Sequence, residues 1–361
     1  MKKILPILSI LALMICSSII FTGCLGDEDT NSRKKVAITF SHSSAIWDVY
    51  GDSLKKELEQ NGFDVDFQFT NSVDEQIMQI GKMIESNPAC LVVGAVDRTR
   101  LANILEQAKE KNVPVIAYDR LILDSDAISY YVSFDAQAVG AAMGEYIEYA
   151  LQLKGPMQLT HVTESLAPPN FPTSAPYYIE VFAGDPNDKN ARLYFDGAMQ
   201  VLQPYFNNGT FVCRSGELTF DKVCEANWDP KEGERRMRRL MQTFYSHGES
   251  LNIVLCPNDD AAEFVRNLLK EYNYSGAYPI ITGQDAEQKA LQAIREGTQS
   301  MTIYKPADEL AAKTVRMIKA VVEGTQPEIN DPKSNDNGKI TVPSYLCLPI
   351  IIDKNNLDIV K

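Results

Sequence analysis

Polar side chains suited to hydrogen bonding recur directly after the apolar, strand-like runs of this chain. They are Asp119, Arg120, Asp135, Asn190, Asn258, Asp285 and Lys305. Asp, Asn and Arg each hold two or more bonding atoms in one plane, so one side chain can contact two neighbouring groups of a ligand. This chemistry suits the vicinal hydroxyls of a sugar.

Two tryptophans accompany these polar residues. Trp47 follows the first apolar run, in the same loop region as His42, and Trp228 precedes a predicted helix at 231–245. An indole face suits the C–H face of a pyranose ring. A single Trp is more often a core residue, and a single Asp at a helix start, such as Asp135, is more often an N-cap. The recurrence of these residues at many strand ends is therefore more informative than any one of them.

Apolar periodicity predicts an alternation of strands and helices along most of the chain. The expected strands are 36–40, 63–69, 90–95, 113–118, 129–133, 178–183, 210–214, 252–256, 278–282, 301–304 and 340–352, and the expected helices are 47–61, 74–86, 97–111, 135–153, 188–205, 231–245, 259–271, 285–296 and 308–323. This alternation predicts an α/β fold with two lobes, each a doubly wound parallel sheet covered by helices on both faces. Ligands of such sheets bind beyond the carboxyl ends of the strands.

Composition excludes several classes of function. The 361 residues carry 35 Lys and Arg against 48 Asp and Glu, a net charge of −13, which argues against nucleic-acid binding. Seven Cys and three His show no metal-binding spacing, so we expect neither a metal nor a cofactor. Nucleotide-binding and hydrolase motifs are missing, and Asp119 beside Arg120 suits a general acid poorly, so no enzyme is expected.

The N-terminus has the layout of an export signal. Lys2 and Lys3 precede an apolar stretch at 4–21, and the following Phe-Thr-Gly-Cys resembles a bacterial lipobox ending at Cys24. This predicts a signal peptide at 1–23, lipidation of Cys24, a tether at 24–35, and a protein anchored at the extracytoplasmic face of the membrane. An uncleaved anchor or simple secretion are the alternatives.

Export changes the meaning of the cysteines. After Cys16 and Cys24 are set aside, an odd number remains, five in all. Cys213 and Cys224 could form a disulfide, although spacing alone leaves this open.

Several stretches resemble the type I periplasmic sugar-binding proteins, closest to the xylose-binding and multiple-monosaccharide-binding branch. They are VPVIAYDRLI at 113–122, YYVSFDAQAVG at 130–140, PNDKNARLYFDGAMQVLQPY at 186–205, ITGQDAE at 281–287 and QSMTIYKP at 299–306. The resemblance runs from about residue 36 to 352. It implies two lobes joined by three crossovers: 36–135 with 306–334, and 136–305 with 335–361. It also implies a monomer that captures xylose or another aldose and delivers it to the permease and ATPase of an ABC importer.

The resemblance also assigns roles to individual residues. It implies that Asp119 and Arg120 bind hydroxyls from the first lobe, that Trp47 stacks on the ring, and that His42 adds a contact. From the second lobe it implies Asn190, Asn258 and Asp285, with Trp228 nearby. Lys305, at a crossover, should also reach the ligand. Asp135 is a weaker candidate for ligand binding, because an N-cap role at the crossover helix also explains it.

This chain departs from the family pattern in its first loop. His42 and Ile46 stand where that branch usually has Lys and Arg, which leaves the identity of the sugar open. The Pro-containing segment 159–176 is expected to form a loop or flap. Hinges are expected near Asp135, Lys305 and Asn335, and a sugar sensor that signals to a chemoreceptor or membrane kinase is the alternative function.

Overall fold

The computed structural model describes residues 34–42, 46–154, 171–172 and 174–360. The predicted signal peptide, Cys24 and nearly all of the tether lie outside the described residues, as does most of segment 159–176. Within the described ranges, no helix combines the length and apolar character needed to cross a membrane.

The first lobe is built on a six-stranded sheet. Its order is β2-β1-β3-β4-β5-β11, and every neighbouring pair is parallel. The strands are β1 (Lys35–Ser41), β2 (Asp64–Thr70), β3 (Cys90–Gly94), β4 (Val115–Tyr118), β5 (Ile128–Phe134) and β11 (Ser344–Cys347). Its helices are α1 (Ile46–Gln60), α2 (Val73–Glu85), α3 (Ala102–Glu110) and α10 (Ala307–Val322).

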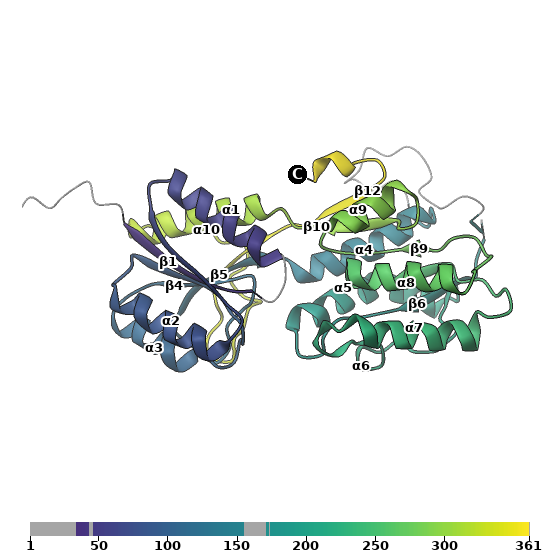
Figure 1. The fold of residues 1–361 in the computed structure, drawn as a ribbon, viewed down its shortest axis with the longest axis horizontal. Coiled ribbons are helices and arrows are strands. Elements are labelled where there is room, and N and C mark those ends of the chain that lie inside the picture. The colour runs from purple at the N-terminus through teal and green to yellow at the C-terminus, as the bar shows by residue number, and fades with distance from the viewer. Residues whose placement is uncertain (1–33, 43–45, 155–170, 173, 361) are drawn as a thin grey trace, which may run out of the picture. The chain divides into compact units, whose positions relative to one another are not determined.

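Strand periodicity explains why helices cover both faces of this sheet. Val36, Ile38 and Phe40 of β1 pack into one apolar core with α1 and α10, whereas Ala37 packs into a second core with α2 and α3. Successive side chains of a strand point to opposite faces, so a continuously apolar strand requires cover on both sides. Figure 1 shows α1 and α10 on one side of the sheet and α2 and α3 on the other.

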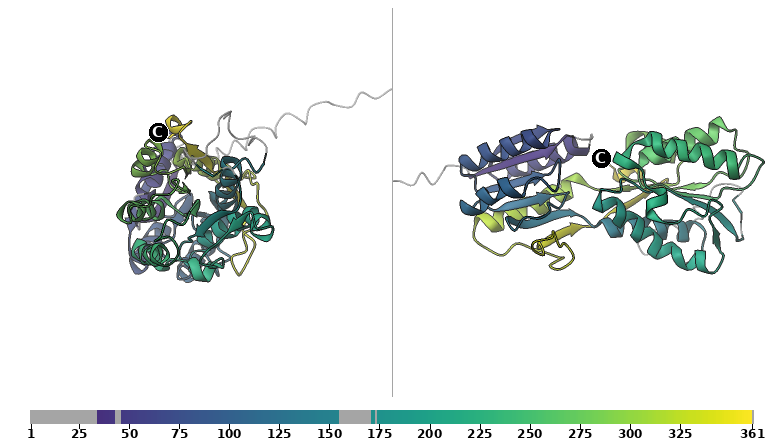
Figure 2. Two further views of the ribbon diagram at one scale, coloured as in Figure 1. Left: turned by 90° about the vertical axis from the view of Figure 1, so that its right-hand side faces the viewer. Right: turned by 90° about the horizontal axis from the view of Figure 1, so that it is seen from below.

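The second lobe contains two sheets. β7 (Phe211–Val212), β6 (Tyr177–Val181), β8 (Ile253–Leu255) and β9 (Ile280–Ile281) form a parallel sheet in that order, and β10 (Met301–Tyr304) pairs antiparallel with β12 (Ile350–Asp353). The helices are α4 (Ala136–Ala150), α5 (Lys189–Asn207), α6 (Phe220–Val223), α7 (Pro230–Phe244), α8 (Asp259–Glu271) and α9 (Gln288–Arg295), with 3₁₀ turns η1 (Ala226–Trp228) and η2 (Leu357–Ile359). One apolar core joins α4 and α5 to the sheet, and another joins α7 and α8 to it. Figure 2 shows helices on both faces of the sheet in this lobe.

Helices α4 and α5 pack unusually closely because glycines lie at their contact. A Cβ atom on Gly140 would lie 1.8 Å from the Tyr194 carbonyl oxygen, and one on Gly197 would lie 2.2 Å from the Gln137 carbonyl oxygen. These distances are far below van der Waals contact, so only glycine allows this spacing. The packing holds the start of α5, which carries the polar residues of the site, against α4.

The expected α/β fold with three crossovers is confirmed, but the position of the third crossover was predicted wrongly. The chain passes between lobes at Asp135, at Lys305, and between β11 and β12 at 348–349, rather than near Asn335. The predicted strand 340–352 is two strands in two different sheets. Asn337 Nδ2 donates to the carbonyl oxygens of Ile122 (3.2 Å) and Ser125 (2.6 Å), which binds this segment to the first lobe.

The cysteines of the described residues are all free. Cys90, Cys256 and Cys347 are buried, whereas Cys213 and Cys224 are partly exposed. The two are not joined: Cys213 Sγ lies 3.2 Å from Ser215 Oγ, and Cys224 Sγ donates to the Asp221 carbonyl oxygen.

Candidate functional site

A largely buried ion pair joins Lys305 and Asp285 near the strand ends. Lys305 follows β10 and Asp285 follows β9, and Lys305 Nζ lies 2.8 Å from Asp285 Oδ1. The side chains are only 11% and 27% exposed, so the pair is largely shielded from water. The Asp285 backbone N–H donates to the Ile303 carbonyl oxygen (2.9 Å) and holds the residue at φ 96°, a conformation that non-glycine residues rarely adopt.

The charge of Lys305 depends on acidic and phenolic groups from both lobes. Burial alone lowers its pKa, but Asp285 and, in decreasing order, Tyr194, Tyr50 and Asp119 raise the pKa well above its usual value. Tyr50 and Asp119 belong to the first lobe, whereas Asp285 and Tyr194 belong to the second. Lys305 therefore stays charged at neutral pH.

Asp119 and Arg120 follow β4 in the turn where the sheet ends. Asp119 has φ 62°, and its carbonyl oxygen accepts hydrogen bonds from Tyr131 Oη (2.8 Å) and Ser133 Oγ (3.0 Å) of β5. Burial raises the pKa of the Asp119 carboxyl, against the lowering effects of Lys305 and Arg120. Asp188 and Asp285 of the second lobe also influence this carboxyl, so groups from several strand ends converge electrostatically on it.

The structure gives Trp47 and His42 different environments from those expected. Trp47 is 1% exposed, packs edge-on against Phe40 (ring centroids 5.4 Å apart), and has the Arg120 guanidinium 5.2 Å from its ring centroid. In this structure Trp47 is a core residue, and the stacking partner on its face is Arg120 rather than an exposed ligand surface. His42 is exposed, stacks on Phe69, and has Nε2 2.9 Å from Asp48 Oδ1.

In the second lobe, Asp188 connects the start of α5 with Trp228. Asp188 Oδ1 accepts the backbone N–H of Asn190 (2.8 Å), and Oδ2 accepts from Trp228 Nε1 (3.4 Å). The indole lies directly over Gly184, where a Cβ atom would lie 2.1 Å from the ring. Sequence reasoning missed Asp188, although it lies two residues before the predicted Asn190 in the same loop.

Asp135 and Asn258 both cap helices. Asp135 Oδ1 accepts the Ala138 N–H, and Asn258 Oδ1 accepts the Ala261 N–H, each at 2.9 Å. The N-cap interpretation of Asp135 is thus confirmed. Capping fixes the orientation of both side chains at the carboxyl ends of β5 and β8.

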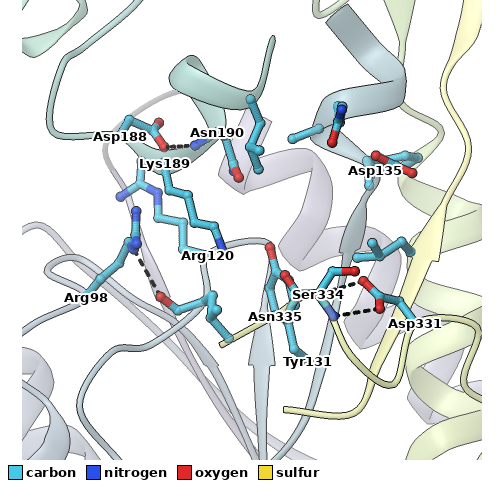
Figure 3. Close-up of a pocket in the computed structure, with 16 residues that line it drawn as sticks. Arg98, Arg120, Tyr131, Asp135, Asp188, Lys189, Asn190, Asp331, Ser334 and Asn335 are labelled. Carbon is cyan, nitrogen blue, oxygen red and sulfur yellow. Dashed lines mark hydrogen bonds between the residues drawn. The ribbon is translucent and has the colours of Figure 1, made fainter. Parts of the chain in front are cut away.

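A pocket of about 240 Å³ collects part of the predicted site (Figure 3). Of the predicted residues, Arg120, Asp135 and Asn190 line it, whereas the other seven do not. Further lining residues with polar groups are Arg98, Tyr131, Gln137, Asp188, Lys189, Asp331, Ser334 and Asn335. Of these, Asp331, Ser334 and Asn335 come from the segment between α10 and β11 of the first lobe.

The arrangement suits a ligand rich in hydroxyls. Carboxylates, an amide, guanidinium groups and an ammonium line or adjoin the pocket, and together they can donate and accept many hydrogen bonds. Within the described part of the chain, no group of three or more His, Cys, Asp or Glu could hold a metal ion.

Comparison with known proteins agrees with this arrangement. The family model described as periplasmic binding protein domain matches residues 36–326. The multiple sugar-binding periplasmic protein SbpA of Azospirillum brasilense is 38% identical over 318 residues (87% of this chain, 84% of that protein). The D-xylose-binding periplasmic protein of Haemophilus influenzae is 31% identical over 314 residues (86% and 83%).

A solved structure is similarly close. An ABC transporter solute binding protein from Clostridium phytofermentans with bound β-D-glucose is 38% identical, with a TM-score of 0.77, covering 91% of this chain and 96% of that one. These relatives are binding proteins, which agrees with the expectation that the chain is not an enzyme. The chain belongs to the periplasmic binding protein domain family, among the relatives of its multiple sugar-binding and D-xylose-binding members.

Proposed function

We propose that this protein captures a monosaccharide between its two lobes and delivers it to an ABC importer. The observation that carries the proposal is the convergence of Asp119 and Arg120 of the first lobe with Asp188, Asp285 and Lys305 at the other strand ends. The 38% identical relative with bound glucose supports an aldose as the ligand.

The proposed site extends beyond the pocket lining. Asp119, Arg120, Asn190, Asp285 and Lys305 are proposed to bind hydroxyls. Asp119 and Arg120 follow β4, Asp285 follows β9, Lys305 follows β10, and Asn190 lies in the first turn of α5. Asn258 and Trp228 flank them in the second lobe. Trp47 supports the site from the core by holding Arg120 in place.

Capture requires the closed arrangement to bind the sugar more tightly than the open one. Contacts from both lobes are complete only when the lobes meet around the ligand, and this difference in affinity shifts the equilibrium toward closure. The hinge positions proposed for this motion are the three crossovers at Asp135, Lys305 and 348–349, where the chain changes lobe.

The proposal includes anchoring through a lipidated Cys24. One acyl chain holds a protein only marginally, so several chains are needed for a stable anchor. Metabolic labelling with palmitate should label the parent chain and not the Cys24→Ala variant, and the variant should leave the membrane fraction. A variant that stays in that fraction unlabelled would indicate an uncleaved anchor instead.

Thermal unfolding tests sugar capture directly. The soluble form starting at Asp27 is heated with xylose, arabinose, glucose, galactose or ribose. A ligand at a hundred times its Kd stabilises the folded state by about 2.7 kcal/mol, which raises the Tm of a chain of this size by roughly 4 °C. If none of the five sugars raises the Tm, the proposed function fails.

A further inference from the structure

The turn that carries Asp285 has a backbone conformation that needs support. Asp285 has φ 96° and Ala286 has φ 52°, so two successive residues other than glycine have positive φ angles. Such conformations cost free energy and persist only where the surrounding structure holds them. We refer to residues 283–287, which lie between β9 and α9, as the Asp285 turn. The groups that hold this turn therefore decide where the Asp285 carboxylate lies.

A buried carboxyl group packs against the Asp285 turn. Asp259, the first residue of α8, is 0% exposed, and its Oδ2 accepts the backbone N–H of Glu287 at 3.0 Å. Its own backbone N–H donates to the Gln284 carbonyl oxygen at 3.0 Å. A Cβ atom on Gly283 would lie 2.2 Å from Asp259 Oδ1, so glycine is needed for the carboxyl to lie this close to the backbone. Asp259 thus contacts the turn at both of its ends.

Thr302 of β10 connects this carboxyl to the residue that follows Asp285. The Thr302 hydroxyl donates to Asp259 Oδ2 (3.0 Å) and accepts the backbone N–H of Ala286 (3.2 Å). Gln299 Nε2 donates to the other carboxyl oxygen, Asp259 Oδ1, at 2.8 Å. Thr302 and Gln299 are both buried, so removing one member of this network leaves a hydrogen-bonding group unsatisfied away from water.

The network acts on the backbone of the turn, whereas the Asp285 side chain forms the ion pair with Lys305. The two carboxyl groups nevertheless interact. Burial is the largest cause that raises the pKa of Asp259, and the negative charge of Asp285 raises this pKa as well, against the hydrogen bond from Glu287, which lowers it. Asp259 and Asp285 are therefore close enough in space for a change at one to be felt at the other.

We propose that Asp259 is a positioning residue of the ligand site: together with Thr302, it holds the Asp285 turn so that the Asp285 carboxylate faces Lys305 and the ligand. The effect on sugar binding rests on the proposed function, whereas the effect on the ion pair does not. Asp259 needs no contact with the ligand for this role. Hydrogen bonds weaken steeply when their distance or angle changes, so a small displacement of Asp285 is enough to weaken binding.

A double-mutant cycle with Asp285→Ala tests this role in sugar binding. Thr302→Val removes the hydroxyl and keeps the shape of the side chain. Asp259→Asn also keeps the shape, but its amide N–H₂ then lies opposite a donor, either the Glu287 N–H or Gln299 Nε2. The two substitutions therefore disturb the network at different points without emptying the core.

Calorimetric titration measures the cycle with the one sugar, among xylose, arabinose, glucose, galactose and ribose, that raises the parent Tm most. We expect Thr302→Val to weaken binding about fivefold and Asp259→Asn about tenfold. In the Asp285→Ala background each should change the Kd less than about twofold, because the effect passes through Asp285. Thr314→Val makes the same change at another buried threonine, on α10 of the first lobe, and should leave the Kd unchanged.

Unfolding in urea gives a second readout that needs no sugar. If the network positions Asp285 for its ion pair, Thr302→Val should lower the free energy of unfolding less in the Asp285→Ala background than in the parent. Thr314→Val should lower it equally in both backgrounds, because Thr314 Oγ1 donates to the Leu310 carbonyl oxygen within α10.

The outcomes separate this inference from the proposed function. When a sugar binds, the titrations decide: equal weakening by Thr302→Val in both backgrounds, or no weakening in either, overturns the positioning role and leaves sugar capture intact. If none of the five sugars binds the parent chain, sugar capture fails, and the urea cycle decides: additive losses of stability overturn the positioning of Asp285, and non-additive losses support it. If Asp259→Asn fails to fold, the Thr302→Val results decide.

Discussion

Replacing Asp285 with alanine removes the carboxylate that lies 2.8 Å from Lys305 Nζ and leaves a largely buried ammonium without its ion pair. At this distance the direct attraction is about 6 kcal/mol with an effective dielectric constant of about 20, before the cost of removing both groups from water. Breaking a buried pair typically costs about 3–5 kcal/mol of stability. Because the Asp285 side chain is 27% exposed, we expect the lower end, about 3 kcal/mol.

Two quantities should change together in the Asp285→Ala variant. The free energy of unfolding in urea should fall by about 3 kcal/mol, which corresponds to a Tm lower by roughly 4 °C for a chain of this size. Loss of a charged hydrogen bond to a hydroxyl, worth about 1.5–3 kcal/mol, should weaken sugar binding about 10- to 150-fold in calorimetric titration. The stability difference should persist across neutral pH, because the pKa of Lys305 is raised well above its usual value and the ammonium stays charged in this range.

The controls distinguish a structural role from a ligand contact. Asp285→Asn keeps the shape and an accepting oxygen while removing the charge, so it should fall between parent and alanine variant in both measurements. Asp52→Ala, at an exposed position of α1, should change neither. If Asp285→Ala unfolds more easily but binds sugar with the parent Kd, Asp285 stabilises the fold through its ion pair with Lys305 and does not bind the ligand, which refutes its site assignment. Unchanged stability would refute the ion-pair reasoning.

Three further expectations concern the rest of the chain. Burial raises the pKa of Glu225 from 4.5 to about 8, so the folded state keeps a proton that the unfolded chain loses. The free energy of unfolding should therefore fall by up to about 1.4 kcal/mol per pH unit as the pH rises through this range. In urea titrations at several pH values, the Glu225→Gln variant should lose less stability per pH unit than the parent. Trp47 is 1% exposed, so any change in tryptophan fluorescence on sugar binding should come from Trp228. The change should vanish in Trp228→Phe and persist in Trp47→Phe. The reverse result would place the ligand against Trp47. Ellman's reagent should find no more than two reactive thiols in the native soluble form and five after denaturation; only three after denaturation would show that Cys213 and Cys224 had paired.

Local patterns were sufficient to predict the α/β alternation and the positions of the polar residues at strand ends. Apolar runs such as 90–95 and the amphipathic helices between them depend on neighbours a few residues away, which the sequence displays directly. The same patterns could not show that 340–352 divides between two sheets. β11 pairs with β5 and β12 pairs with β10, and each pair joins segments far apart in the chain. An apolar strand fits the edge beside β5 as well as the edge beside β10, so the apolar pattern does not tell which sheet a segment joins.

The sequence alone was enough to predict that Asp119, Arg120, Asp285 and Lys305 follow strands. Only the tertiary structure decided that Lys305 pairs with Asp285 and that Trp47 is buried beneath Arg120, because both contacts join separate elements. The sequence could not show these contacts, because electrostatic and packing interactions depend on distance in space rather than along the chain.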